Sequence, residues 1–284
     1  MPASAALDVG LLPGTRALLA VHARELPQRD DLCGAFCGAL ALRAAGIEAR
    51  GEEPVDQDAV ASLAGTVVSR APVPGVLPRG ESGRRDYRLS IPLADEAETS
   101  GTSAAGVAGA VEALSGEQLA AIPFSGPWTA GAPDGAPGTL DGLFDLAAAL
   151  ERPVTLIANL ATRHLWGSRP SVAELLGYLL DGAQAGPPPD WDVGHFVCVL
   201  ARVRGPGGSL YVLADTYPSL GRGGVHAQPA ERLAAAIERR DMPAGGVIAV
   251  VDRADAAAVR AGAAALGLVE ALWDNGSAAQ ATPR

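Results

Sequence analysis

Three side chains in this sequence are of the types that a thiol-dependent acyl-transfer reaction needs. Cys33 follows an acidic loop and opens an apolar segment, so we expect it at the start of a helix. The free backbone N–H groups and the dipole of a helix start favour a thiolate, which is the nucleophilic form of cysteine. His195 opens a β-like segment, and an imidazole with a pKa of about 6.5 suits general acid–base chemistry. Asp215 ends the next β-like segment, where its carboxylate can bond an imidazole and fix its tautomer.

A β-hairpin is the element that would bring the histidine and the aspartate together. Residues 194–204 and 209–215 are two β-like segments, and the Gly/Pro-rich turn 205–208 separates them. Counted from that turn, His195 and Asp215 lie roughly opposite each other. The helix that begins at Cys33 must then pack against the same end of this hairpin.

The neighbours of these residues offer one further candidate and two competitors. Gln28, in the loop before Cys33, could donate its amide to an oxyanion together with the Cys33 backbone N–H. Cys37 is the competing nucleophile, but it lies one turn further into the helix, where a thiol is expected to pack. Cys198, three residues after His195, is expected in the core. No second Cys/His pair has the spacing of zinc ligands, so we expect neither a metal nor a cofactor.

Two stretches resemble the papain-like cysteine peptidase superfamily. The stretch QRDDLCGAFCGALALRAAG, residues 28–46, resembles the nucleophile helix of the bacteriocin-leader (double-glycine) peptidases and their stand-alone relatives. The stretch GHFV, residues 194–197, followed by Asp215, is similar to the histidine strand and aspartate of that family. Phytochelatin synthase is similar in part, through Cys-Gly, Gly-His-Phe and an Asp shortly before Tyr-Pro. The resemblance implies a papain-like fold with Cys33 as nucleophile, His195 as base, Asp215 as orienting carboxylate and Gln28 as oxyanion donor.

The order of elements predicts an α+β protein in which an N-terminal helical part packs on an antiparallel sheet. We expect a single domain over residues 1–275, with a helical part over about 1–150, a family-specific insertion over about 66–138 and a sheet part over about 151–275. Residues 276–284 are expected to be a disordered tail. The expected helices cover residues 12–24, 33–45, 55–64, 104–120, 140–150, 171–180, 229–240 and 254–266. The expected strands cover residues 87–91, 122–124, 153–159, 194–204, 209–215 and 246–251.

Composition and charge narrow the classes of partner. The 284 residues carry a net charge of −10 and no lysine, which argues against broad nucleic-acid binding and against an anionic membrane surface. No apolar run reaches the roughly 18 residues of a membrane-spanning helix, and a secretory signal is not expected. Three cysteines are too few for a disulfide framework and suggest reduced thiols, so we expect a cytoplasmic protein. Its oligomeric state is left open.

These observations predict a cysteine-dependent amide or thioester hydrolase or acyltransferase that acts on a peptide or a small amide or thioester. The alternative is a catalytically inactive papain-like binding or scaffold protein, because Gln28 lies one residue closer to Cys33 than is usual in the family. Leu32 also stands where the family has an acidic residue. A third alternative is an α/β protein without this ancestry, in which Cys33 and His195 lie far apart.

Overall fold

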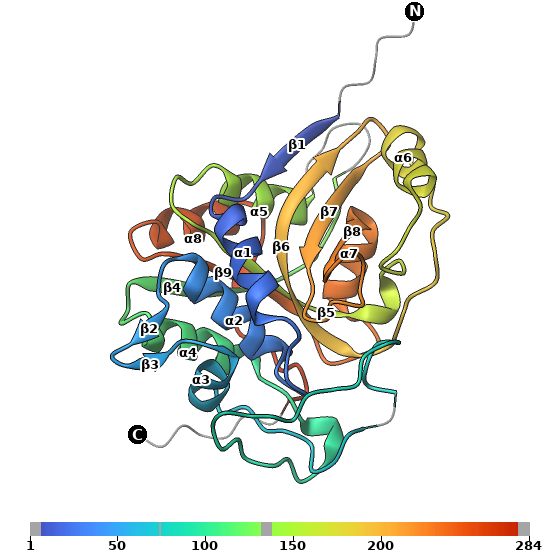
Figure 1. The fold of residues 1–284 in the computed structure, drawn as a ribbon. Helices are drawn as coiled ribbons and strands as arrows, with labels where there is room; N and C mark the ends of the chain where they lie inside the picture. Colours follow the sequence, from blue (N-terminus) through green and yellow to red (C-terminus); the bar gives the residue numbers. More distant parts are fainter. Residues whose placement is uncertain (1–6, 74, 132–137, 278–284) are drawn as a thin grey trace, which may run out of the picture.

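A strongly twisted antiparallel sheet forms the centre of the protein. The computed structural model describes residues 7–73, 75–131 and 138–277. Eight strands of these residues join in the order β10-β4-β9-β5-β6-β7-β8, with β1 paired to β6, and every neighbouring pair is antiparallel (Figure 1). The strands are β1 (Asp8–Leu11), β4 (Leu119–Ser125), β5 (Thr155–Ala161), β6 (Gly194–Arg204), β7 (Ser209–Ala214), β8 (Val225–Pro229), β9 (Gly246–Asp252) and β10 (Val269–Glu270). The short strands β2 (Ala49–Arg50) and β3 (Glu53–Pro54) form a separate hairpin.

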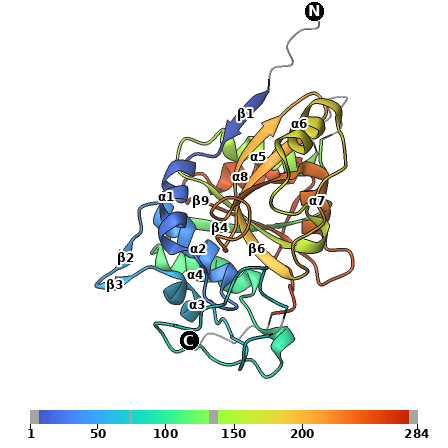
Figure 2. The same cartoon turned by 45° about the vertical axis from the view of Figure 1, so that its right-hand side comes forward.

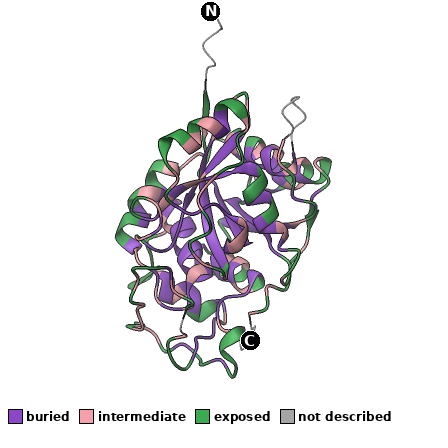
Figure 3. Cartoon of the chain, turned by 90° about the vertical axis from the view of Figure 1, so that its right-hand side faces the viewer, coloured by how far each residue is buried: buried purple, intermediate pink, exposed green. Residues whose placement is uncertain are grey.

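Helices cover both faces of this sheet, so that its central strands are buried on two sides. One face packs against α1 (Thr15–Glu25), α2 (Cys33–Ala44), α3 (Gln57–Leu63) and α4 (Ala104–Leu114). The other face packs against α5 (Thr139–Ala148), α7 (Ala230–Glu238) and α8 (Ala256–Ala265), and α6 (Val172–Asp181) lies beside β7 (Figure 2). Every residue of β5 is buried, as is typical of a strand between two layers of helices. Figure 3 shows that the strands in the middle of the molecule are mostly buried, whereas the outer helices are partly exposed.

The structure confirms the α+β class and most of the predicted helices. The helix predicted over 171–180 begins with a complete capping box between Ser171 and Glu174, because each side chain bonds the backbone N–H of the other residue. The hairpin of β6 and β7 forms around the predicted turn. The described part of the chain has no helix with both the length and the apolar character needed to cross a bilayer.

Several boundaries were predicted wrongly. Residues 87–91 form no strand, and the helix expected to continue to residue 120 ends at Leu114 because β4 begins at Leu119. The strands β1, β8 and β10 and the β2–β3 hairpin were not predicted, because each is too short to show an alternating pattern. Because β1 and β4 belong to the first half of the chain, the division into a helical part and a sheet part is incomplete.

The segment predicted as an insertion, residues 66–138, includes α4 and β4, and β4 is a strand of the central sheet. Its described part before α4 makes isolated bridges, such as the one between Val67 and Gly101, and one 3-10 turn, η1 (Ala97–Thr99). In Figures 1 and 2 it passes below the first turn of α2 and the beginning of β6. Of the expected disordered tail, Gly276 and Ser277 are described, whereas residues 278–284 lie outside the described residues. The insertion likewise includes residues 74 and 132–137, which are not described.

Candidate active site

The first turn of α2 touches the strand that carries His195. Gly34 follows Cys33, and a Cβ atom at Gly34 would lie 3.0 Å from Thr102 and Val107 and 3.2 Å from Phe196. A larger residue therefore could not pack here without displacing its neighbours. Phe196 is the residue after His195, so this close approach brings the cysteine and the histidine to one place.

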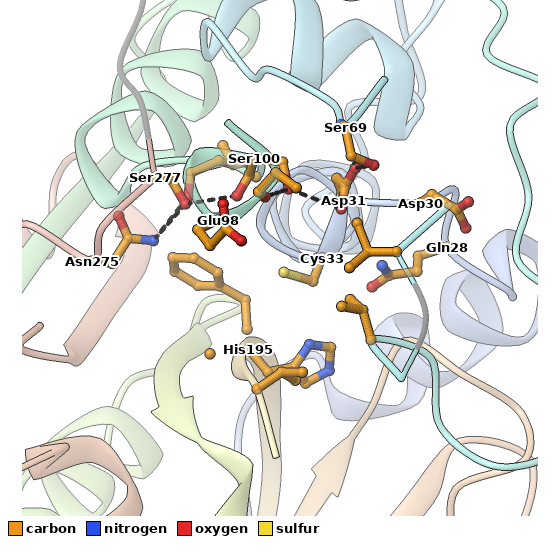
Figure 4. Close-up of a pocket in the computed structure, with 18 of the residues that line it drawn as sticks. Gln28, Asp30, Asp31, Cys33, Ser69, Glu98, Ser100, His195, Asn275 and Ser277 are labelled. Carbon is orange, nitrogen blue, oxygen red and sulfur yellow. Dashed lines mark hydrogen bonds between the residues drawn. The ribbon is translucent and has the colours of Figure 1, made fainter. Parts of the chain in front are cut away.

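Cys33 and His195 both line a cavity of about 370 Å³. Its size is within the usual range for small-molecule sites, roughly 300–1,000 Å³. Figure 4 shows the Cys33 sulfur near its centre, with His195 on one side and Gln28 beside the sulfur. The predicted insertion supplies the opposite wall, through residues that include Ser69, Pro72, Val73, Val76, Leu77, Glu98, Ser100 and Thr102.

A buried carboxylate holds the imidazole by one ring nitrogen. His195 and Asp215 are each 2% exposed, and His195 Nε2 donates a hydrogen bond of 2.9 Å to Asp215 Oδ1. The same oxygen accepts a bond of 2.7 Å from the Thr216 backbone N–H. The pairing of Cys198 with Ala214 puts Asp215 just beyond the last strand pair, at the end of the hairpin where β6 begins. Because Nε2 is engaged with Asp215, Nδ1 is the nitrogen left for the thiol.

The second oxygen of Asp215 is held by another histidine. His226 Nε2 lies 3.1 Å from Asp215 Oδ2, and His226 Nδ1 lies 3.1 Å from Gln228 Nε2. An amide nitrogen can only donate, so Nδ1 of His226 accepts and its Nε2 carries the proton. Gln228 is itself fixed by two bonds to the backbone of Trp166. On the other side, His22 Nε2 bonds the Asp215 backbone carbonyl at 2.6 Å. The carboxylate therefore has a fixed position.

The charges of this network shift two pKa values in opposite directions. Burial lowers the pKa of His195, but attraction to Asp215, the hydrogen bond to it and the interaction with the Cys33 sulfur together raise the pKa to about 10. Burial raises the pKa of Asp215, but His195 and His226 lower it more, so that this pKa lies well below its usual range. At neutral pH the pair is thus an imidazolium and a carboxylate.

Gln28 lies in the position that the sequence predicted for an oxyanion donor. It is 4% exposed, lines the cavity beside Cys33, and its backbone N–H donates to the Thr216 carbonyl at 2.9 Å. Among the described residues its side-chain oxygen has no hydrogen-bond partner. A buried amide oxygen without a partner is costly, and because it accepts hydrogen bonds, a donor group of a ligand would satisfy it.

The other two cysteines are part of the core. Cys37 and Cys198 are both 0% exposed, and the Cys198 thiol lies against the Cys37 carbonyl. Cys33, by contrast, is only partly buried and reaches the cavity. Among the described residues no group of three His, Cys, Asp or Glu side chains is arranged to hold a metal ion.

A model of a family of unknown function, DUF6885, matches residues 12–274. The chain belongs to this family. The match includes Cys33, His195 and Asp215, together with the whole sheet except β1. No curated protein matches the sequence.

Four residues at the site of this DUF6885 chain were not predicted as functional. Trp191 packs edge-on against His195, with ring centroids 4.9 Å apart. His226 belongs to β8, a strand that the sequence did not reveal. Asn159 and Arg239 line the cavity from β5 and from the end of α7. Only Trp191 had a sequence signal, because it precedes the Gly-His-Phe stretch by three residues.

Proposed function

We propose that this protein is a cysteine-dependent amide or thioester hydrolase or acyltransferase with a papain-like fold. The observation that carries the proposal is that Cys33 shares a cavity with an imidazole whose other nitrogen is held by a buried carboxylate. Support for the papain-like fold comes from a cysteine at the start of a helix that packs on an antiparallel sheet. The sheet carries the histidine on one strand and the aspartate at the end of the next.

In the proposed reaction, the Cys33 thiolate attacks the carbonyl carbon of an acyl substrate and forms a C–S bond. A protonated His195 beside the sulfur favours the thiolate over the thiol. The oxyanion that develops accepts hydrogen bonds from the backbone N–H of Cys33 and the amide of Gln28. When the intermediate collapses, the bond to the leaving group breaks and His195 gives its proton to that group.

The second half of the reaction returns the enzyme to its starting state. Neutral His195 takes a proton from water or from an amine as that molecule attacks the thioester carbon. The C–S bond then breaks, the acyl group leaves on the acceptor, and Cys33 is again a thiolate beside an imidazolium. Asp215 orients the ring throughout through its bond to Nε2.

The test is selective alkylation of Cys33 by iodoacetamide at pH 6, followed by peptide mass spectrometry. We expect Cys33 to react at least tenfold faster than glutathione, because a free thiol is about 0.3% ionised at this pH. We expect His195→Ala to remove that advantage. Cys37 serves as an internal control, since it is fully buried and should stay unlabelled in the folded protein.

A Cys33 that reacts no faster than glutathione, in a protein whose circular dichroism shows it to be folded, contradicts the proposal. That outcome would favour a catalytically inactive papain-like binding or scaffold protein. Rapid labelling that survives in His195→Ala would equally show that the imidazole does not activate the sulfur.

A further inference from the structure

An arginine that pairs with no carboxylate in the described part of the chain lies in the wall of the cavity that contains Cys33. Arg239 is 2% exposed, and among the described residues its only side-chain hydrogen bond runs from Nη1 to Asn159 Oδ1, at 2.7 Å. Its Nε is buried and has no partner among those residues. A buried guanidinium is normally paired with a carboxylate, because an unpaired charge is expensive to bury.

The backbone around Arg239 is adapted to this side chain. Arg239 ends α7 in the left-handed region, with φ 47°, a position where helices usually have glycine. Two glycines leave room for the side chain, since a Cβ at Gly194 would lie 3.0 Å from Nη2 and one at Gly245 would lie 2.9 Å from Cδ. Because the backbone of Arg239 is strained and two glycines make room for its side chain, we infer that the guanidinium itself has a function and does not merely end the helix.

One nitrogen of the guanidinium is left for a ligand. Asn159 holds Nη1, and its oxygen also accepts a bond from Trp273 Nε1, which fixes the amide. Nε is fully buried, whereas Nη2 lies beside Gly194, which lines the cavity, and has no hydrogen-bond partner among the described residues. A guanidinium N–H binds a carboxylate through a strong, charge-assisted hydrogen bond. Burial lowers the pKa of Arg239, whereas the nearby Cys33 raises it, so the guanidinium and the sulfur are within electrostatic reach of each other.

We propose that Arg239, held by Asn159, is the subsite for a carboxylate of the substrate whose acyl group reacts at Cys33. This inference rests on the proposed function and names the class of its substrate. The substrate is a small amide or thioester with a free carboxylate near the reacting carbonyl, such as an N-acylated amino acid or a peptide end. Within a long polypeptide only Asp and Glu side chains carry a carboxylate, and the cavity of about 370 Å³ has the size of a small-ligand site.

The opposite wall favours a single negative charge over a phosphate or a polyanion. Asp31 and Glu98 line the cavity on the far side of Cys33 from His195 (Figure 4). Like charges at short range repel, so a ligand with several negative charges would be disfavoured there. One guanidinium with one amide neighbour matches the charge and the planar shape of one carboxylate.

The test is protection of Cys33 from iodoacetamide by N-acetylglycine, with N-acetylglycinamide as the matched neutral compound. We measure the concentration that halves the labelling rate at pH 9, where any accessible thiol reacts. For the wild-type protein we expect this concentration to be at least tenfold lower for the acid than for the amide. Arg239→Gln should abolish the difference and Arg239→Lys should keep part of it. Arg163→Gln should not change it, because Arg163 is a nearby surface arginine paired with Asp192 and Asp241.

Equal protection by the acid and the amide in the wild-type protein overturns the inference, and this result does not depend on whether Arg239→Gln folds. A preference for the acid that persists in folded Arg239→Gln overturns it as well. Because every accessible thiol reacts at pH 9, the preference can be measured even if Cys33 shows no activation at pH 6. The failure of the subsite and the failure of the proposed function are therefore separate outcomes.

Discussion

Replacing Asp215 by asparagine tests whether the buried carboxylate sets the state of the imidazole beside Cys33. In the wild-type protein the pKa of His195 is about 10, so the ring is almost fully protonated at pH 7. Asp215→Asn removes the largest contribution that raises this pKa and leaves the burial that lowers it, so the pKa should fall towards its ordinary value of about 6.5. A much larger share of the imidazole is then neutral at pH 7.

The size of the effect follows from the loss of that charge. Without an imidazolium beside it, the Cys33 sulfur loses the charge that favours its thiolate, and a free thiol is only about 3% thiolate at pH 7. A thiolate of higher pKa is also a better nucleophile, which offsets part of the roughly 30-fold loss. We therefore expect labelling of Cys33 by iodoacetamide to be about tenfold slower at pH 7 in the variant.

The assay is the labelling rate of the Cys33 peptide between pH 5 and 10, measured for both proteins. The wild-type rate should depend less on pH than the rate of the variant, which should keep rising towards the pKa of a free thiol. Asp241→Asn is the matched control, because Asp241 is an exposed carboxylate that pairs with His164. If folded Asp215→Asn has the wild-type rate and the wild-type pH profile, the reasoning about this network is wrong.

Three further predictions concern stability and packing. The pKa of His195 is raised from 6.5 in the unfolded chain to about 10 in the folded protein, so protonated His195 stabilises the fold fully below pH 6.5 and this stabilisation is lost as the pH rises through 10. The free energy of urea unfolding should decline over this pH range, and His195→Gln should reduce the decline. Gly34→Ala should lower the free energy of unfolding by about 1–3 kcal/mol and slow the labelling of Cys33, because the new methyl group would clash with Thr102, Val107 and Phe196. A variant with wild-type stability and unchanged labelling would contradict the packing argument. His226→Phe should lower the free energy of urea unfolding by about 1–3 kcal/mol, because Asp215 Oδ2 loses its hydrogen-bond donor. An unchanged urea midpoint would show that this hydrogen bond contributes little to stability.

The sequence alone was enough to predict the local elements that carry the candidate residues. Cys33 begins a helix and His195 begins a strand, as the apolar patterns around them predicted, because such patterns are local and continuous. The turn at residues 205–208 joins β6 and β7, since glycine and proline restrict the backbone at that place. Gln28 was predicted at the site from its place in the loop before Cys33 and lines the cavity in the structure.

Only the tertiary structure decided what surrounds these residues. His226 reaches Asp215 from a strand of five residues, which is too short to be recognised by its pattern. Arg239 looks in the sequence like any charged residue at a helix end, and its burial depends on β5 and on two distant glycines that make room for it. The burial of a side chain and the charges around it depend on segments that are far apart in the chain, and periodicity within a single segment carries no information about them.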